Sequence, residues 1–344
     1  MVLSVLFWTA ITVIATAVLW KGSDWLEQSS EKLSLYYELP NIVQGAIVVA
    51  IGTSFPELST VVLSTLLHGE FDLGVSAIVG SAIFNILVIP SVAGLITQGP
   101  IESNRDLIYK EAQFYIISVA VLMIVFALAV IYNPVTGGGS AILGEMNRLL
   151  ALLPLVIYGI YIFIQYQDTM DYEPEVAAEH IRPLKQWGLL FASLAVILVS
   201  VEMLVRAAIH FGDIFNTPSF LWGLSVIAVV TSIPELFVSI RKAQKGDAVT
   251  SLANVLGSNI FDLLVCIPVG VLIAGAAVVN FSIAAPMIGA LTLGTFIIFS
   301  FMRTDMELSI AESYGLLFFY LVFLLWMGLE SFGVINTIPS LVVI

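Results

Sequence analysis

The sequence predicts an all-α membrane protein with ten transmembrane helices in two inverted five-helix repeats. Three observations lead to this fold class. The 344 residues are 59% hydrophobic and only 11% charged, with a mean hydropathy of +1.04, whereas soluble domains carry about 25% charged residues. Ten segments are apolar and long enough to cross a bilayer, and two of them recur in the second half of the chain.

The composition excludes several classes of protein. A soluble enzyme would need about twice this charge to cover its surface. The formal net charge of −13 makes nucleic acid an unexpected partner. The single cysteine, Cys266, excludes an internal disulfide and a multi-cysteine metal site. We expect no cofactor and infer no protein partner, and lipid is the expected surroundings.

A spanning helix needs about 20 mostly apolar residues. The expected spans of the first half are residues 3–20, 42–67, 73–97, 112–132 and 141–166. Those of the second half are residues 187–210, 219–240, 248–274, 282–302 and 310–332. We expect the first span to be a retained helix rather than a removed signal peptide, because no basic segment precedes it and no cleavage site is obvious.

The spans define three regions: a first transmembrane repeat over 1–166, an acidic cytoplasmic loop over 167–186 and a second repeat over 187–344. We interpret the loop as a solvated connection, with a weak regulatory cation site as the alternative. Its acids are Asp168, Asp171, Glu173, Glu175 and Glu179.

The distribution of Lys and Arg predicts the orientation. Ten spans place both termini on one side of the membrane. The other side receives Lys21, Lys32, Arg105, Lys110, Arg182, Lys185, Arg241, Lys242, Lys245 and Arg303. The terminal side receives only Arg148 and Arg206. Since Lys and Arg concentrate in cytoplasmic loops, we expect a multi-pass protein of the cell membrane with both termini extracytoplasmic.

An internal repeat relates the two halves. Residues 40–58 match 218–236 at an offset of 178, and 80–87 (GSAIFNIL) match 257–264 (GSNIFDLL) at an offset of 177. The full motif regions extend over about 40–97 and 218–274. Because each repeat has an odd number of spans, the second enters the membrane from the opposite side. Secondary transporters often use such inverted repeats, with the binding site at the midplane.

Three acids lie well inside apolar spans: Glu57, Glu235 and Asp262. A charge at the bilayer centre costs about 3 kcal/mol on insertion scales. A structural ion pair is the plain alternative. It is disfavoured because the spans that carry these acids hold no Lys or Arg before Arg241.

Oxygen-bearing residues accompany each acid at helical spacing. Thr53 and Ser54 lie four and three residues before Glu57, and residues three and four apart share a helix face. The same spacing relates Thr231 and Ser232 to Glu235, Ser81 to Asn85, and Ser258 to Asp262.

Prolines in two of these spans supply further oxygens. Pro56 and Pro234 remove helical hydrogen bonds and free the carbonyls of Gly52 and Val230. Such hard oxygen ligands suit Ca²⁺ or Na⁺ and not zinc or copper. Back-bonding of each hydroxyl to its own helix is the alternative for a single Ser or Thr. We expect four glycines, Gly74, Gly80, Gly257 and Gly270, to permit close helix packing.

At these residues the chain resembles the sodium/calcium exchanger family of the cation/Ca²⁺ exchanger superfamily, in its prokaryotic type without a regulatory domain. The duplicated segments look like the family's alpha repeats, with signatures G-T-S-x-P-E and G-S-N-x-F-(N/D). The chain departs from them at Ala82, where Asn is usual, and at Val230, which replaces a glycine.

The resemblance implies an ion site and a mechanism. The implied ligands are Ala50, Thr53, Ser54, Glu57, Ser81, Asn85, Ala228, Thr231, Ser232, Glu235, Ser258 and Asp262. The family binds one Ca²⁺ or several Na⁺ at overlapping sites and alternates access between the two sides. Its first and sixth helices act as a gate, which implies a gating role for 3–20 and 187–210.

We therefore expect a secondary active antiporter that exchanges Na⁺ for Ca²⁺, and not an enzyme. A Ca²⁺/H⁺ or other divalent cation antiporter is the nearest alternative. The T-S-x-P-E form of the motif favours sodium, because proton-coupled relatives usually carry G-N-x-x-E. A channel fits less well, because a site with three carboxylates should hold its ion too firmly for rapid conduction. An intramembrane hydrolase fits less well, because the chain shows no H-E-x-x-H or G-x-G-D segment.

Overall fold

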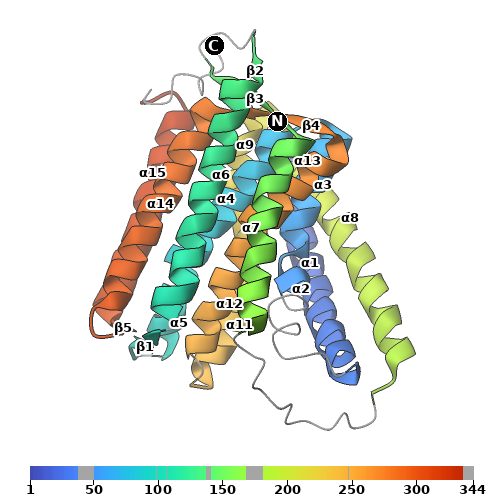
Figure 1. Cartoon of the computed structure of the whole chain (residues 1–344). Coiled ribbons are helices and arrows are strands. Elements are labelled where there is room, and N and C mark those ends of the chain that lie inside the picture. The colour runs from blue at the N-terminus through green and yellow to red at the C-terminus, as the bar shows by residue number, and fades with distance from the viewer. Residues whose placement is uncertain are drawn as a thin grey trace.

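The computed structural model describes residues 1–37, 50–97, 99–105, 107–136, 141–167, 181–246 and 248–335. Within these residues nine helical segments are long and apolar enough to cross a membrane. The tenth expected span, 42–67, begins outside the described residues and continues in α2 and α3. The all-α membrane fold is thus confirmed, and Figure 1 shows the bundle that the helices form.

The elements follow the predicted order. The first half contains α1 (Val2–Tyr36), α2 (Ala50–Thr53), α3 (Phe55–His68), α4 (Phe71–Leu87), α5 (Ile89–Thr97), β1 (Ile101–Glu102), the π-helical turn η2 (Leu107–Glu111), α6 (Ala112–Tyr132), β2 (Pro134–Val135), β3 (Leu143–Asn147) and α7 (Arg148–Gln167).

The second half repeats this plan. It contains α8 (Pro183–Phe215), α9 (Ser219–Trp222), the π-helical turn η3 (Gly223–Ile227), α10 (Ala228–Thr231), α11 (Ile233–Gln244), α12 (Ala248–Phe261), the π-helical turn η4 (Asp262–Cys266), α13 (Ile267–Ala274), β4 (Ala276–Asn280), α14 (Phe281–Arg303), β5 (Glu307–Leu308) and α15 (Ile310–Ser331).

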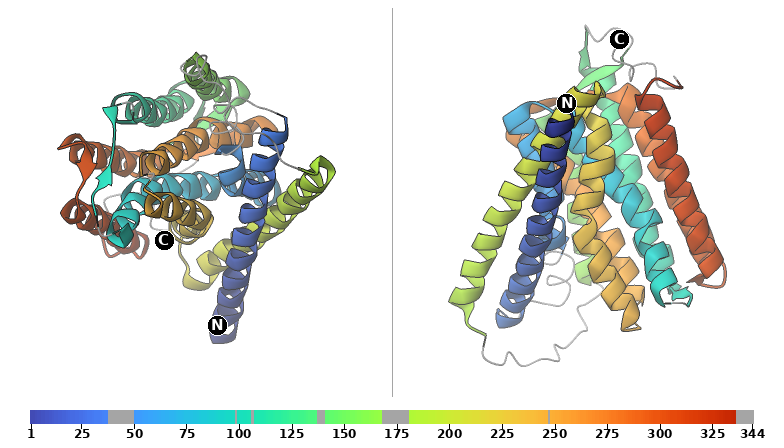
Figure 2. Two further views of the ribbon diagram at one scale, coloured as in Figure 1. Left: turned by 90° about the horizontal axis from the view of Figure 1, so that it is seen from below. Right: turned by 180° about the vertical axis from the view of Figure 1, so that it is seen from behind.

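The first helix of each repeat is longer than its apolar segment. α1 has 35 residues and α8 has 33. The two helices pack antiparallel at the edge of the bundle (Figure 2), with the Trp8 ring stacked on His210 at one end. Further along, a Cβ added to Gly22 would lie 3.0 Å from Ile197 Cγ1. The close approach of the helices at Gly22 and the length of their contact hold the pair together.

The second span of each repeat, and the third span of the first repeat, is interrupted shortly before a proline. The helix breaks at Ser54 and Ser232, each two residues before a proline, and again at Val88, two residues before Pro90. The predicted bends at Pro56 and Pro234 are therefore present. The breaks at Ser54 and Ser232 start the helices α3 and α11 in the interior of the bundle, and the break at Val88 starts α5.

The expected fifth span, 141–166, was wrong at its start. Leu143–Asn147 form strand β3, and the helix begins only at Arg148. β3 pairs antiparallel with β4, from Leu143–Asn280 to Asn147–Ala276. At Gly144 the strand lies against α6, where an added Cβ would be 2.5 Å from Val130 N. Pairing with a strand distant in sequence thus determines the conformation of this segment.

The strand pairings express the inverted symmetry. β1 follows α5 and pairs with β5, which precedes α15. β4 follows α13 and pairs with β3, which precedes α7. In each case the strand after the third span of one repeat meets the strand before the fifth span of the other. Figure 1 shows the two pairings at opposite ends of the bundle.

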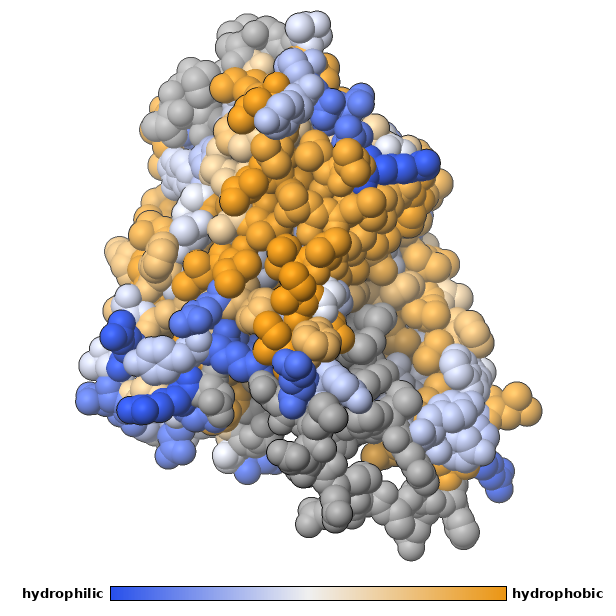
Figure 3. Space-filling model, viewed as in Figure 1, coloured by the Kyte–Doolittle hydropathy of each residue, from blue (hydrophilic) through white to orange (hydrophobic). Residues whose placement is uncertain are grey.

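The surface carries the pattern of a membrane protein. Figure 3 shows a broad apolar belt between hydrophilic regions at the two ends. The N-terminus and the end of α15 lie at one end in Figure 1, and the ends of α1, α11 and α14 lie at the other. The chain is a multi-pass membrane protein, and the boundaries 1–166, 167–186 and 187–344 stay predictions because most of the loop lies outside the described residues.

Candidate ion-binding site

The three acids are buried in the interior of the bundle. Glu57, Glu235 and Asp262 expose 2%, 1% and 1% of their surface. Glu57 and Glu235 lie in the first turns of α3 and α11. These helices begin inside the membrane because of the breaks at Ser54 and Ser232. The unpaired N–H groups of a helix start favour negative charge, so the break in each span stabilises the acid that follows it.

The carboxylates lie close enough to repel one another. Glu57 interacts unfavourably with Glu235 and Asp262, and Glu235 interacts unfavourably with Asp262. They do not form a tight chelate by themselves, since no group of three His, Cys, Asp or Glu side chains in the described part of the chain is compact enough to hold one metal ion. A cation bound here would also need the oxygens of neighbouring residues.

Hydroxyl groups join the helices around these acids. Thr53 Oγ1 lies 3.1 Å from Ser258 Oγ, which links α2 to α12. Ser81 Oγ lies 2.7 Å from Ser232 Oγ, at the break between α10 and α11. Ser81 Oγ also donates to Glu57 Oε1 at 3.5 Å. All four hydroxyl residues are buried, so the polar faces of the two repeats meet in the interior.

Several oxygens at this meeting point are buried without a hydrogen-bond partner. They are Ser54 Oγ, Glu57 Oε2, Asn85 Oδ1 and Glu235 Oε2. Buried polar atoms are nearly always paired, and each exception calls for an explanation. Four acceptor oxygens from both repeats, beside mutually repelling carboxylates, form an environment that a desolvated cation would stabilise.

The predicted ligands other than the acids and the unpaired oxygens differ in the contacts that they make. Thr53, Ser81, Ser232 and Ser258 are in direct contact across helices. Thr231 donates to Ala228 O at 3.3 Å, so this hydroxyl back-bonds to its own helix. Ala50 begins α2, and its side chain lies outside the described residues. The role of these residues as ion ligands stays a prediction.

Asp262 has a partner that the sequence did not assign to the site. Cys266 Sγ donates to Asp262 Oδ1 at 3.6 Å, one turn along η4. This buried cysteine thus makes a polar contact with one of the predicted ligands. Elsewhere, the half-buried His68 pairs with Glu202, with 3.2 Å between His68 Nε2 and Glu202 Oε1.

Two residues outside the predicted ligand set orient Asn85. Asn259 Nδ2 donates to Ala82 O at 3.1 Å and to Tyr115 OH at 3.2 Å. This fixes the Asn259 amide, so its Oδ1 accepts from Asn85 Nδ2 at 3.0 Å. Asn85 Oδ1 is then left unpaired. The asymmetry between Ala82 and Asn259 in the repeated motif was the sequence signal for this network, whereas Tyr115 gave none.

A comparison with protein families identifies the family of the chain. The family model described as "Sodium/calcium exchanger protein" matches residues 7–167 and 185–329. The chain belongs to the sodium/calcium exchanger protein family. The two matched segments correspond to the two repeats, and this family is one of transport proteins.

Members and relatives of the exchanger family are similar over most of their length. Sodium/calcium exchanger MaX1 of Methanosarcina acetivorans is 25% identical over 344 residues, which cover 91% of this chain and 96% of that protein. Inner membrane protein YrbG of Escherichia coli is 28% identical over 276 residues, covering 77% and 79%.

Solved exchanger structures share the fold. The sodium-calcium exchanger NCX_Mj matches with a TM-score of 0.62 and 22% identity, covering 94% of this chain and 98% of that one. The H⁺/Ca²⁺ exchanger CAX matches with a TM-score of 0.71 and 13% identity, covering 97% and 83%. At these identities the likeness establishes the architecture and not the transported ions.

Proposed function

We propose that this family member is a secondary active antiporter that exchanges Na⁺ for Ca²⁺ across the cell membrane by alternating access. The observation that carries the proposal is the set of unpaired acceptor oxygens from both repeats around Glu57, Glu235 and Asp262. Ca²⁺ takes 6–8 oxygen ligands in flexible geometry, and the hydroxyl, carboxamide and carboxylate groups of this site are of that kind.

Charge balance explains why such a site would exchange ions rather than leak. An empty site with three ionised carboxylates carries three negative charges in a low-dielectric interior, which is costly. One Ca²⁺ neutralises two of them, and three Na⁺ neutralise all three. The loaded site is therefore close to neutral, and the protein can readily change the membrane face to which the site is open. With the empty, charged site this change of access is slow. Obligatory coupling of the two ions follows.

Ca²⁺/H⁺ exchange, or transport of another divalent cation, is the second candidate. Its support is the repulsion among the three buried carboxylates, because protons would relieve that repulsion as well as Na⁺ does. The hydroxyl groups around the acids favour Na⁺, since a bound proton needs no ring of further oxygens.

Flux in proteoliposomes distinguishes the two candidates. We expect radiolabelled Ca²⁺ uptake to follow an outward Na⁺ gradient at equal pH on both sides. Uptake should be small with a pH gradient alone. Uptake driven equally well by a pH gradient in the absence of Na⁺ would replace the sodium proposal by proton coupling, and uptake without either gradient would indicate a uniporter or channel.

A further inference from the structure

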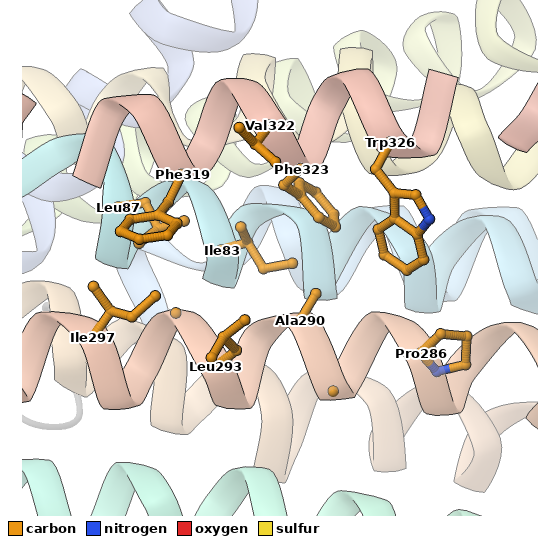
Figure 4. Close-up of a pocket in the computed structure, with 12 residues that line it drawn as sticks. Ile83, Leu87, Pro286, Ala290, Leu293, Ile297, Phe319, Val322, Phe323 and Trp326 are labelled. Atoms are coloured by element: carbon orange, nitrogen blue, oxygen red, sulfur yellow. The ribbon is translucent and has the colours of Figure 1, made fainter. Parts of the chain in front are cut away.

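Away from the ion site, a groove lies on the lipid-facing side of the bundle. It is an apolar groove of about 330 Å³ between α14 and α15, with Ile83 and Leu87 of α4 as its floor (Figure 4). The α15 wall consists of Phe319, Val322, Phe323 and Trp326. Its volume is in the range of about 300–1,000 Å³ that is typical of sites for small ligands.

Small residues hollow out the opposite wall on α14. A Cβ added to Gly289 would meet no atom within 4 Å. Ala290 follows it, and Gly294 lets α14 approach Ile86 and Leu87, with an added Cβ at 3.3 Å from Ile86 Cδ1. The groove therefore has a tight base and an open mouth. Leu293 at the mouth is 60% exposed and Val322 is 45% exposed.

The corresponding helix pair of the first repeat is packed differently. Phe114 of α6 and Tyr161 of α7 lie with ring centroids 5.2 Å apart, and Tyr161 OH donates to Glu111 Oε2 at 3.0 Å. Large side chains and a hydrogen bond thus join α7 to α6. The groove between α14 and α15 departs from the internal symmetry, so it is a property of the second repeat.

The length and position of the groove fit one kind of occupant. Its α14 wall runs from Pro286 to Ile297, which is about 16 Å along a helix at about 1.5 Å per residue. One leaflet of a bilayer contributes about 15 Å of hydrocarbon. Trp326 and Pro286 lie together at one end of the groove (Figure 4), toward the end of α15 and the start of α14. That end is the terminal side of the membrane, where Trp is favoured at the headgroup level.

We propose that this groove binds an acyl tail of a phospholipid from the leaflet on the terminal side. The lining residues are apolar or glycine throughout, so a hydrocarbon chain buries them without stranding a polar group. The bound tail would lie against the face of α4 behind Asn85, between Ile83 and Leu87. This inference depends on the membrane fold and not on which ions are exchanged.

Photocrosslinking from the acyl tail tests the proposal. The protein would be reconstituted with a phosphatidylcholine that carries a diazirine either near the headgroup end or near the terminal end of one tail. We expect peptides with residues 286–297 and 319–326 to be labelled several-fold more than α7 around Gly159. The diazirine near the headgroup should label the Trp326 end, and the terminal one should label the Phe319 end.

A matched pair of variants provides the control. Gly289→Phe places a ring in the groove and should reduce labelling of 286–297 several-fold. Gly159→Phe is made at an equally open glycine, because an added Cβ there also meets nothing within 4 Å, and it should leave groove labelling unchanged. Equal labelling of the groove peptides and of α7 around Gly159 in the unaltered protein would overturn the proposal. Unchanged labelling of residues 286–297 in folded Gly289→Phe would also overturn it.

Discussion

At the scale of single residues, the two glutamates at the starts of α3 and α11 define the site. Each is almost fully buried and has an unpaired carboxylate oxygen. Their mutual repulsion is stored in the empty site and released when a cation binds. Apart from Asp262, the third carboxylate, the other residues of the site contribute neutral oxygens, so the acids should dominate the affinity.

The first prediction concerns these acids. Glu57→Gln or Glu235→Gln should each lower Na⁺-driven Ca²⁺ flux by more than about a hundredfold. Each acid would be one partner of a buried pair of carboxylate and bound cation, and losing one partner of a buried charge pair costs about 3–5 kcal/mol. Asp262→Asn should be milder for Ca²⁺, because Ca²⁺ needs only two negative charges. Flux in proteoliposomes measures the effect, with the thermal midpoint as a check on folding. Near-normal flux in both glutamine variants would remove these acids from the site.

The second prediction concerns Asn259. Asn259→Ala removes the partner that holds Asn85 Nδ2 at 3.0 Å, so the Asn85 amide is free to turn its oxygen away from the site. We expect a roughly tenfold rise in the KM for Ca²⁺, because a lost buried hydrogen bond costs about 1–3 kcal/mol. Tyr115→Phe removes a single hydroxyl from the same network and should raise KM less. A change in maximal flux with KM unaltered would contradict this positioning role.

The contrast between Glu57 and Tyr115 shows how far the sequence predicts the site. An acid in an apolar span is conspicuous because burying it is costly, and the duplication placed a second copy 178 positions later. Tyr115 looks like any aromatic residue of an apolar helix. Its hydroxyl reaches Asn259 only because of how α6 is rotated against α12, and hydropathy does not encode that rotation.

At the scale of elements, the site depends on a close crossing of α4 with η3 and α10. A Cβ added to Gly80 would lie 2.4 Å from Leu224 O and 2.8 Å from Ala228 Cβ. On the other side of the crossing, a Cβ added to Gly223 would lie 2.4 Å from Ser76 Oγ. The expected close approach at Gly80 is confirmed. The same expectation was wrong at Gly257, where the nearest atom to an added Cβ is Tyr161 Oη at 3.9 Å.

The third prediction follows from this crossing. Gly80→Ala should push α4 away from α10 and separate Ser81 from Ser232, whose hydroxyls are 2.7 Å apart. Overpacking of this kind costs about 1–3 kcal/mol, so we expect a lower thermal midpoint together with reduced Ca²⁺ flux. Gly159→Ala, at an open position, is the control and should change neither. A fully active and stable Gly80→Ala protein would show that the crossing tolerates an extra methyl group.

The ends of elements were the least predictable part of the fold. Hydropathy placed the first span at 3–20, but α1 continues to Tyr36 because its second half is held by α8 and its neighbours rather than by lipid. Conversely, residues 143–147 were expected in a helix and form β3, whose backbone pairs with β4. Both errors arise where partners distant in sequence determine the local conformation.

At the scale of the whole molecule, charge should fix the orientation in the membrane. The N-terminus and the end of α15 lie at the same end of the bundle (Figure 1). The helix ends at the opposite face carry most of the Lys and Arg residues. This asymmetry predicts extracytoplasmic termini. The orientation in turn defines which face of the protein meets the cytoplasm when the direction of ion movement is described.

The fourth prediction tests that orientation. A cysteine at Ser4, which is exposed near the N-terminus, should react with a membrane-impermeant maleimide in intact cells. A cysteine at Lys245, exposed after α11, should react only after the membrane is permeabilised. The native Cys266 is buried and serves as the background control. The reverse pattern of labelling would place the termini in the cytoplasm.

The two strand pairings constrain how such a molecule can move. β1–β5 fastens the repeats to each other at one membrane face, and β3–β4 fastens them at the other. A hinge motion of one half of the bundle against the other would have to break one of these strand pairings in every transport cycle. The α1–α8 pair carries no strand in the part of the chain that the structure describes. We therefore predict that the proposed transport moves the two long helices α1 and α8 along a stationary remainder of the bundle, rather than rocking two equal halves.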